Sequence, residues 1–264
     1  MKQMRLFVMA LAAVMTVGTI SVPAAQAAGL SYGGDIGMVS KYVWRGWQQS
    51  YGPAVQGDLS ASVDGLTGSV WMSNSYAAVA PQLANTAGGA NTPIVETDWT
   101  LDYSGSYDKV GYDIGGLYYT YLNDNGSNFP EIYAGLSYDA PISPSVKVSY
   151  TVAKSGNEYY KVGDTWVDLG VSGSAMGVSL SGTVSFANWK KSTTGLNPRV
   201  PDVWKTGVQL VTLSMSKDFT IGGITATPSL TGTIPVVKKS SDGLRYIYGS
   251  QVNPEVILGV NFSL

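Results

Sequence analysis

The chain ends in VILGVNFSL, residues 256–264, and this stretch alternates between two kinds of side chain. The even-numbered positions are all large and apolar, whereas Gly259, Asn261 and Ser263 between them are small or polar. Successive side chains of a strand point to opposite faces of its sheet. A closing strand with one apolar and one polar face is typical of an outer-membrane β-barrel, because one face meets lipid and the other meets a polar interior. The even-numbered residues are therefore predicted to face lipid.

The start of the chain has the pattern of an export signal. Lys2 and Arg5 precede an apolar run from Leu6 to Val22, and the small residues Ala25-Gln26-Ala27 follow it. This order predicts a cleaved signal peptide at residues 1–27 and one mature domain at residues 28–264. A retained N-terminal membrane anchor is the alternative. The chain contains no cysteine, so neither a lipoprotein anchor nor a disulfide is expected.

The composition favours a membrane barrel over a water-soluble domain. Charged residues make up 13% of the chain, against about 25% in typical soluble domains. Glycine (32 residues) and tyrosine (17 residues) are abundant, and nothing after residue 27 is long and apolar enough for a transmembrane helix. A secreted β-sandwich remains the alternative. Removing Lys2 and Arg5 with the signal takes the formal net charge from −2 to about −4, so nucleic acid is not expected as a partner.

Segments of alternating polarity recur along the mature chain, and their connections alternate between short and long. Twelve such segments are expected as strands: 31–46, 53–64, 66–76, 94–107, 109–122, 129–139, 145–154, 165–173, 176–187, 203–217, 223–236 and 251–264. Short turns on one side and long loops on the other are characteristic of outer-membrane barrels. We therefore predict an all-β fold, a transmembrane antiparallel up-and-down β-barrel of twelve strands. The even count places both termini in the periplasm. In the tenth segment the apolar residues change parity, which predicts a bulge.

The parity of these strands also predicts which side chains line the interior. The candidates are Asp35, Lys41, Arg45, Asp58, Glu96, Asp98, Asp102, Asp113, Tyr119, Glu131, Tyr133, Lys147, Asp168 and Glu255. They comprise nine carboxylates and three bases. A lipid-facing Arg or Lys costs about 2–4 kcal/mol at the bilayer midplane, which independently favours an inward position for charged residues.

Two interpretations of this acidic interior remain open. One is a narrow channel for passive diffusion of small hydrophilic solutes or ions, in which carboxylates favour cations. The other is a non-conducting structural or adhesive barrel whose lumen is filled. Arg45 is expected to lie within salt-bridge reach of Glu255 across the seam of the first and last strands. The alternative is that Arg45 pairs with the acidic group of Glu96, Asp98 and Glu131.

Aromatic residues gather at the expected strand ends, where they would form the interfacial girdles of a membrane barrel. Ordinary β propensity is the alternative explanation. The residues are Tyr42, Trp44, Trp47, Tyr103, Tyr107, Tyr121, Tyr138, Phe186, Trp189, Phe219 and Phe262.

Several motifs between residues 30 and 155 resemble a known family. Residues 35–50 read DIGMVSKYVWRGWQQS and residues 53–57 read PAVQG. They are followed by ETD at 96–98, GYDIG at 111–115 and, further on, EIYAGLSY from Glu131. This order is similar to the TorF-type porin family of Gram-negative outer membranes, which implies a porin-like barrel. Lys41 stands where that family has an acidic residue. The resemblance implies no ligand and no catalytic residue.

The residue types present restrict the chemistry. The chain has no histidine and no cysteine, so Ser/His/Asp and Cys/His triads and histidine-bound metals are excluded. We accordingly expect no enzymatic activity, no cofactor and no metal, although paired carboxylates such as Asp98 and Asp102 can in principle perform acid-base work.

The expected partners follow from the predicted location. They are outer-membrane lipid and lipopolysaccharide, small hydrophilic solutes or ions, and the barrel-assembly machinery. The later long loops are rich in bases, which can attract lipopolysaccharide phosphates or simply form a solvated surface. These bases are Lys154, Lys161, Lys190, Lys191, Arg199, Lys205, Lys238, Lys239 and Arg245.

Overall fold

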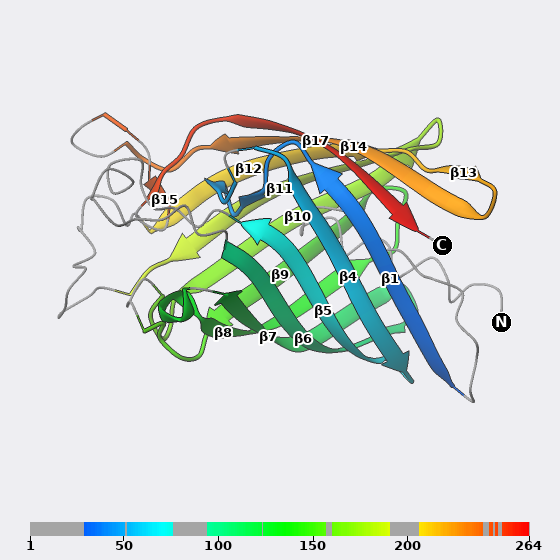
Figure 1. Ribbon diagram of the computed structural model, residues 1–264, viewed down its shortest axis with the longest axis horizontal. Coiled ribbons are helices and arrows are strands. Elements are labelled where there is room, and N and C mark those ends of the chain that lie inside the picture. The colour runs from blue at the N-terminus through cyan, green and yellow to red at the C-terminus, as the bar shows by residue number, and fades with distance from the viewer. Residues whose placement is uncertain are drawn as a thin grey trace.

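Twelve antiparallel strands close into a barrel in the computed structural model, as the alternation predicted (Figure 1). The wall strands are β1 (Leu30–Val39), β4 (Ala54–Val63), β5 (Leu66–Ser75), β6 (Ile94–Tyr107), β7 (Val110–Leu122), β8 (Phe129–Tyr138), β9 (Ser143–Thr151), β10 (Thr165–Ala175), β11 (Val178–Asn188), β12 (Gly207–Ser216), β14 (Ile224–Pro235) and β17 (Glu255–Ser263). Shorter elements are β2 (Val43–Trp44), β3 (Trp47–Gln48), the 3-10 turn η2 (Asn125–Ser127), β13 (Phe219–Ile221), β15 (Tyr246–Ile247) and β16 (Ser250–Gln251).

The structure describes the wall and part of the loops. The described residues are 29–50, 52–75, 94–122, 124–156, 160–190, 206–239, 243–244, 246–247 and 250–263. The expected signal peptide and Leu264 lie outside them, as do the loop bases Lys191, Arg199, Lys205 and Arg245. No helix in the described part of the chain is both long and apolar enough to cross a membrane.

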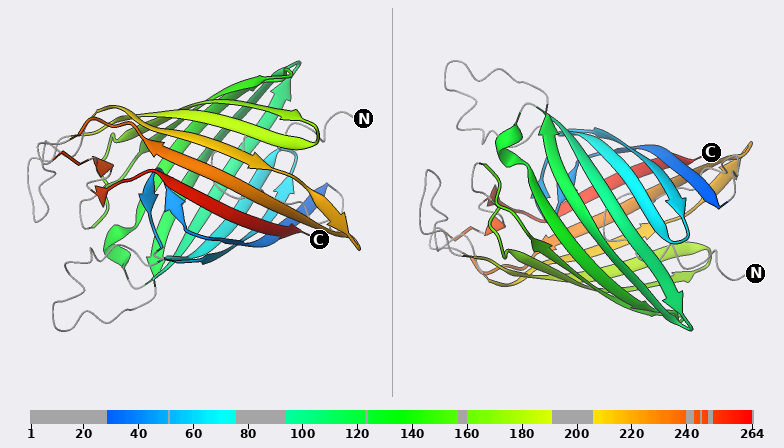
Figure 2. Two further views of the ribbon diagram at one scale, coloured as in Figure 1. Left: turned by 90° about the horizontal axis from the view of Figure 1, so that it is seen from above. Right: turned by 90° about the horizontal axis from the view of Figure 1, so that it is seen from below.

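Strands follow one another around the wall in chain order, and the last joins the first. β1 pairs with β4 from Leu30↔Val63 onward and with β17 from Asp35↔Ser263 to Val39↔Gly259. β12 pairs with β14, which pairs with β17, so the sheet has no free edge among these strands. The start of β1 and the end of β17 therefore lie at the same end of the barrel (Figures 1 and 2).

That end carries short turns with left-handed backbone. Asp64-Gly65, Met176-Gly177 and Gly222-Gly223 all have positive φ, between 49° and 87°, as two-residue hairpin turns matched to strand twist require. The sequence predicted the first of these turns correctly. It placed the second too early, because β10 continues to Ala175. We call this the turn end and the opposite end the loop end.

Alternation sorts the side chains of each strand between the outside and the inside. On β17 the exposed residues include Val256, Leu258 and Phe262, whereas Ile257 and Asn261 are buried. The apolar outer wall is what a lipid-facing surface needs, and the chain therefore has an outer-membrane-type barrel fold. The predicted bulge in the tenth strand is also present, because the β11–β12 register shifts beside Phe186.

The inner face differs between the two ends of the barrel. Towards the turn end it consists mainly of small hydroxyl residues, including Ser60, Ser69, Thr100, Ser137, Ser145, Ser172, Ser181, Ser214 and Ser229. Towards the loop end it is packed with buried aromatic and charged side chains.

Four of the expected girdle aromatics belong to this packed interior. Tyr42, Trp44, Tyr121 and Trp189 are buried, so the girdle interpretation was wrong for them. The physical reason is that their strands or loops present them to the lumen rather than to lipid. Six others are exposed on the outer side: Tyr103, Tyr107, Tyr138, Phe186, Phe219 and Phe262.

Candidate functional site

The first loop folds across the inside of the barrel. β1 ends at Val39, seven residues earlier than the alternation suggested, and the chain then forms the hairpin β2–β3. Trp44 of this hairpin contacts the rings of Tyr119 on β7 and Phe129 on β8, and β8 lies five strands from β1 around the wall. The hairpin therefore crosses the lumen and narrows it near the loop end.

Arg45 sits at the tip of this hairpin. Arg45 and Gly46 both have positive φ, 48° and 82°, and so form a tight left-handed turn. The Arg45 guanidinium donates two hydrogen bonds to Glu131 on β8, at 2.9 and 2.8 Å. Its carbon lies 4.6 Å from the Trp44 ring centre and 5.1 Å from that of Trp166. A planar, two-pronged ion pair between aromatic rings is the arrangement in which arginine binds carboxylate most specifically.

A stack of aromatic rings packs beside the Arg45–Glu131 pair. Tyr119 and Phe129 stack with ring centres 4.4 Å apart, and Phe129 stacks on Tyr160 at 3.6 Å. Trp44 meets the Tyr160 ring edge-on at 6.1 Å. The Tyr119 hydroxyl also donates to Glu131 at 3.3 Å. The stack thus joins the first loop, β7, β8 and the loop before β10 into one cluster.

The other two candidate bases also lie against carboxylates. Lys147 on β9 lies 4.0 Å from Asp113 on β7 and 3.7 Å above the Tyr133 ring centre. The Tyr133 hydroxyl in turn donates to Asp102 at 2.7 Å. Lys41 forms a 2.6 Å ion pair with Glu255 across the β1–β17 seam.

The expected pairing of Arg45 with Glu255 was therefore wrong. Because the chain leaves the wall after Val39, Lys41 rather than Arg45 is the base beside Glu255. Arg45 is carried across the lumen to Glu131, one member of the acidic group named as the alternative.

Two neighbouring carboxylates on β6 are deeply buried. Glu96 is 1% exposed and Asp98 is 5% exposed. The Tyr121 hydroxyl donates to Glu96 at 3.1 Å. Burial, reinforced by these two carboxylates, raises the pKa of the Tyr42 hydroxyl, which therefore remains a proton donor.

The remaining predicted lumen residues also lie on inner-face positions. Asp35 on β1 is directly opposite Asp58 on β4. Asp168 on β10 accepts hydrogen bonds from Trp166 at 2.8 Å and Ser185 at 2.5 Å. The structure thus brings thirteen of the fourteen candidates to the inner wall or the hairpin, and Lys41 to the loop end of the seam.

Sequence reasoning missed the contribution of the first loop. Trp44 was expected at the membrane interface, and Tyr160 was not singled out, yet both pack into the lumen. The Arg45-Gly46 pair between Trp44 and Trp47 was the available signal, because Gly within alternating aromatic residues indicates a hairpin turn.

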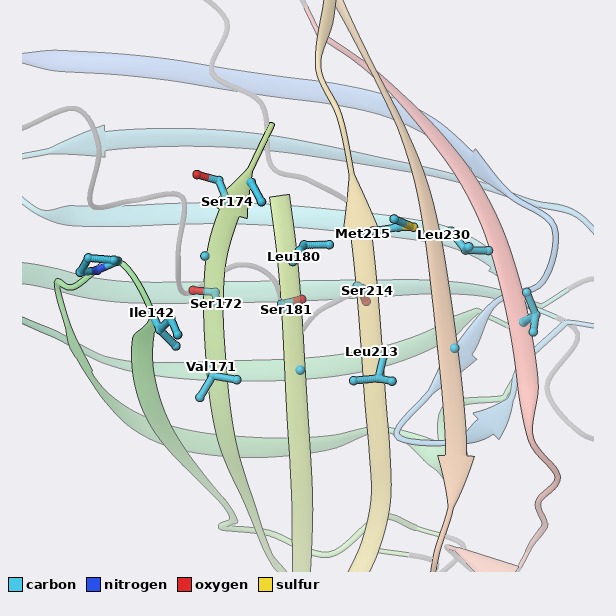
Figure 3. Close-up of a pocket in the computed structure, with 16 residues that line it drawn as sticks. Ile142, Val171, Ser172, Ser174, Leu180, Ser181, Leu213, Ser214, Met215 and Leu230 are labelled. Atoms are coloured by element: carbon cyan, nitrogen blue, oxygen red, sulfur yellow. The ribbon is translucent and has the colours of Figure 1, made fainter. Parts of the chain in front are cut away.

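A hollow lies on the outer side of the wall. This groove has a volume of about 710 Å³ and crosses β10, β11 and β12 towards β17 (Figure 3). Val171, Leu213 and Leu230 line it with outward-facing side chains, and Gly182 lies between Val171 and Leu213. The missing side chain at Gly182 leaves a depression in the apolar surface.

No family model and no curated protein match this sequence. Among solved structures, outer membrane phospholipase A from Escherichia coli is similar in fold, with 13% identity and a TM-score of 0.48 over 88% of this chain and 91% of that chain. A Salmonella typhi outer membrane phospholipase dimer with bound calcium is similar at 13% identity and a TM-score of 0.46, over 88% of this chain and 89% of that chain.

These neighbours correct one expectation from the sequence. Both are named as phospholipases, which are enzymes, so this type of barrel does not by itself exclude catalysis, and the expectation of no enzymatic activity is not upheld. The physical reason is that a barrel wall can carry an active site as well as a pore. At this identity the likeness concerns the fold alone, and no active-site residue is transferred from it.

Proposed function

We propose that the chain is an outer-membrane channel for small hydrophilic solutes and ions, with a narrow acidic constriction that favours cations. The observation that carries this proposal is the excess of inward carboxylates at the level where the first loop narrows the lumen. The resemblance of residues 30–155 to TorF-type porins supports the same function. We also propose that the turn end faces the periplasm, since short turns face that side in outer-membrane barrels.

Along β10, β11 and β12 the approach to the constriction is polar and uncharged. On β10, β11 and β12, Ser172, Ser181 and Ser214 are in register and form a hydroxyl ladder along the inner face. Hydroxyl groups both donate and accept hydrogen bonds, so they replace water around a solute without selecting its charge. This half of the lumen supports the role of an unselective vestibule.

Charge selection would occur deeper in the lumen. The candidate lumen residues comprise nine carboxylates and only three bases, so negative charge is in excess in the lumen. A low-dielectric wall with an excess of one sign concentrates counter-ions near it. The geometry therefore favours passage of cations over anions.

A filled, non-conducting barrel is the second candidate. The stack of Tyr119, Phe129 and Tyr160 favours it, because rings at 3.6 to 4.4 Å leave no space between them. In that case the polar residues serve to hold the wall rigid and the loops provide the function.

Conductance of the purified protein in a planar bilayer under a KCl gradient separates the two candidates. The channel proposal expects small ohmic steps with a reversal potential of cation sign. A membrane that stays sealed supports the filled barrel, and an anion preference contradicts the acidic constriction.

A further inference from the structure

Two positively charged side chains inside the barrel, Arg45 and Lys147, are bound in the same way. Arg45 lies between aromatic rings and binds Glu131, and Lys147 lies over Tyr133 beside Asp113. In each case a carboxylate supplies the charge and a ring face supplies the cation–π contact. The interior of this barrel is thus built to hold nitrogen cations.

A third group of carboxylates and rings lies on the neighbouring part of the wall. Glu96 and Asp98 are adjacent inward residues of β6. Asp98 is in register with Trp71 on β5, and the Trp71 ring meets that of Tyr42 edge-on at 5.4 Å. Glu96 lies close enough to Tyr42 to raise the pKa of the Tyr42 hydroxyl. The hairpin loop therefore covers this acidic pair with an aromatic side chain.

This third group contains no cation from the described part of the chain. Neither Glu96 nor Asp98 forms an ion pair with a described lysine or arginine. Glu96 Oε2 and Asp98 Oδ1 are fully buried and have no hydrogen-bond donor there. Gln56 Oε1, on the inner-face row that runs through Ser73 to Glu96, is also buried without a donor. A buried acceptor without a hydrogen-bond donor lowers the stability of the folded protein. Two adjacent buried carboxylates lower it further.

We propose that Glu96 and Asp98, beneath Tyr42 and Trp71, bind a small organic cation through its ammonium or guanidinium group. Such a group brings several N–H donors and one positive charge, which match the unpaired oxygens. A divalent metal fits less well, because the described residues form no group of three metal-binding side chains and calcium takes six to eight oxygens. The inference rests on the proposed channel only for the route by which the cation arrives.

The test is a binding titration of the whole purified protein in detergent micelles. Ethylammonium chloride and methylguanidinium chloride are the probes, KCl at equal ionic strength is the reference, and tryptophan fluorescence is the readout because Trp71 lies at the site. The double variant Glu96→Gln/Asp98→Asn removes both charges at nearly constant volume. Asp139→Asn, in an exposed turn outside the lumen, is the matched control.

We expect saturable binding of at least one probe to the wild type and to the control, and affinity lower by more than about tenfold in the double variant. Heat-modifiable migration on a gel verifies that each variant is folded. The proposal is overturned if the double variant binds the probes as tightly as the wild type. It is also overturned if KCl changes the fluorescence as much as the probes do, or if the fluorescence of the wild type does not saturate with either probe. If the protein binds a probe but does not conduct ions, the channel is refuted and the cation site stands. If it conducts ions but binds neither probe, the cation site is refuted and the channel stands.

Discussion

Arg45 and Glu131 join two parts of the molecule that are 86 residues apart in the chain and on opposite sides of the barrel. Arg45 lies at the tip of a hairpin that leaves the wall after β1, and Glu131 projects inward from β8. Both side chains are largely buried. The pair therefore anchors the first loop across the lumen.

Replacing Arg45 with alanine should destabilise the barrel. The Glu131 carboxylate would remain buried without its cation, which typically costs about 3–5 kcal/mol. Urea-induced unfolding in lipid vesicles measures the loss of unfolding free energy. Arg45→Lys retains the charge but not the two-pronged geometry, so a smaller loss is expected. If Arg45→Ala unfolds at the wild-type urea concentration, the ion pair is not an anchor.

Shortening the first loop should widen the channel. Replacing residues 41–49 with a short Gly-Ser linker removes the hairpin that crosses the lumen, and single-channel conductance should rise by about twofold or more because the constriction limits the current. An equivalent change in the turn at residues 139–142 should leave conductance unchanged. Equal conductance of the shortened and wild-type proteins would place the constriction elsewhere.

The facing pair Asp35 and Asp58 should contribute to cation preference. They are directly opposite each other on β1 and β4, and like charges in such positions destabilise a sheet. The double variant Asp35→Asn/Asp58→Asn should move the reversal potential in a KCl gradient towards zero and should not lower stability. The effect should shrink as ionic strength rises, because salt screens the charges. A reversal potential that does not change would remove these two residues from the selectivity mechanism.

The two faces of the closing strands should differ in their tolerance of charge. Leu258 on β17 is 60% exposed on the outer wall, and Leu258→Arg should cost about 2–4 kcal/mol in a bilayer. Ser229, on the adjacent β14 and one register position away, lies on the inner face. Ser229→Arg should therefore cost much less. Equal losses in vesicle unfolding experiments would contradict the assignment of the faces.

Most of the wall could be predicted from the sequence because its strands are governed by a local rule. A lipid-facing side chain must be apolar and its neighbour need not be, so the alternation from Val256 to Ser263 reports the orientation of β17 directly. The same rule located the parity change in the tenth strand. It failed at the β10–β11 turn, where Gly173 resembles a turn residue but lies in the strand.

The first loop could not be predicted by that rule. Alternation continues past Val39 into Lys41, Val43 and Arg45, and both a longer strand and an inward hairpin satisfy it. The choice depends on partners far away in the chain, such as Phe129, Glu131 and Tyr160.

The sequence by itself thus determined the barrel class, the number of wall strands and the inward face of most of them, because alternating polarity against lipid is a property of neighbouring residues. Only the tertiary structure decided which base meets which carboxylate: Lys41 with Glu255 and Arg45 with Glu131. It also left Glu96 and Asp98 without a described basic partner. The physical reason is that barrel closure and the inward fold of the first loop bring together residues that are far apart in the chain. No local sequence pattern predicts which of them come into contact.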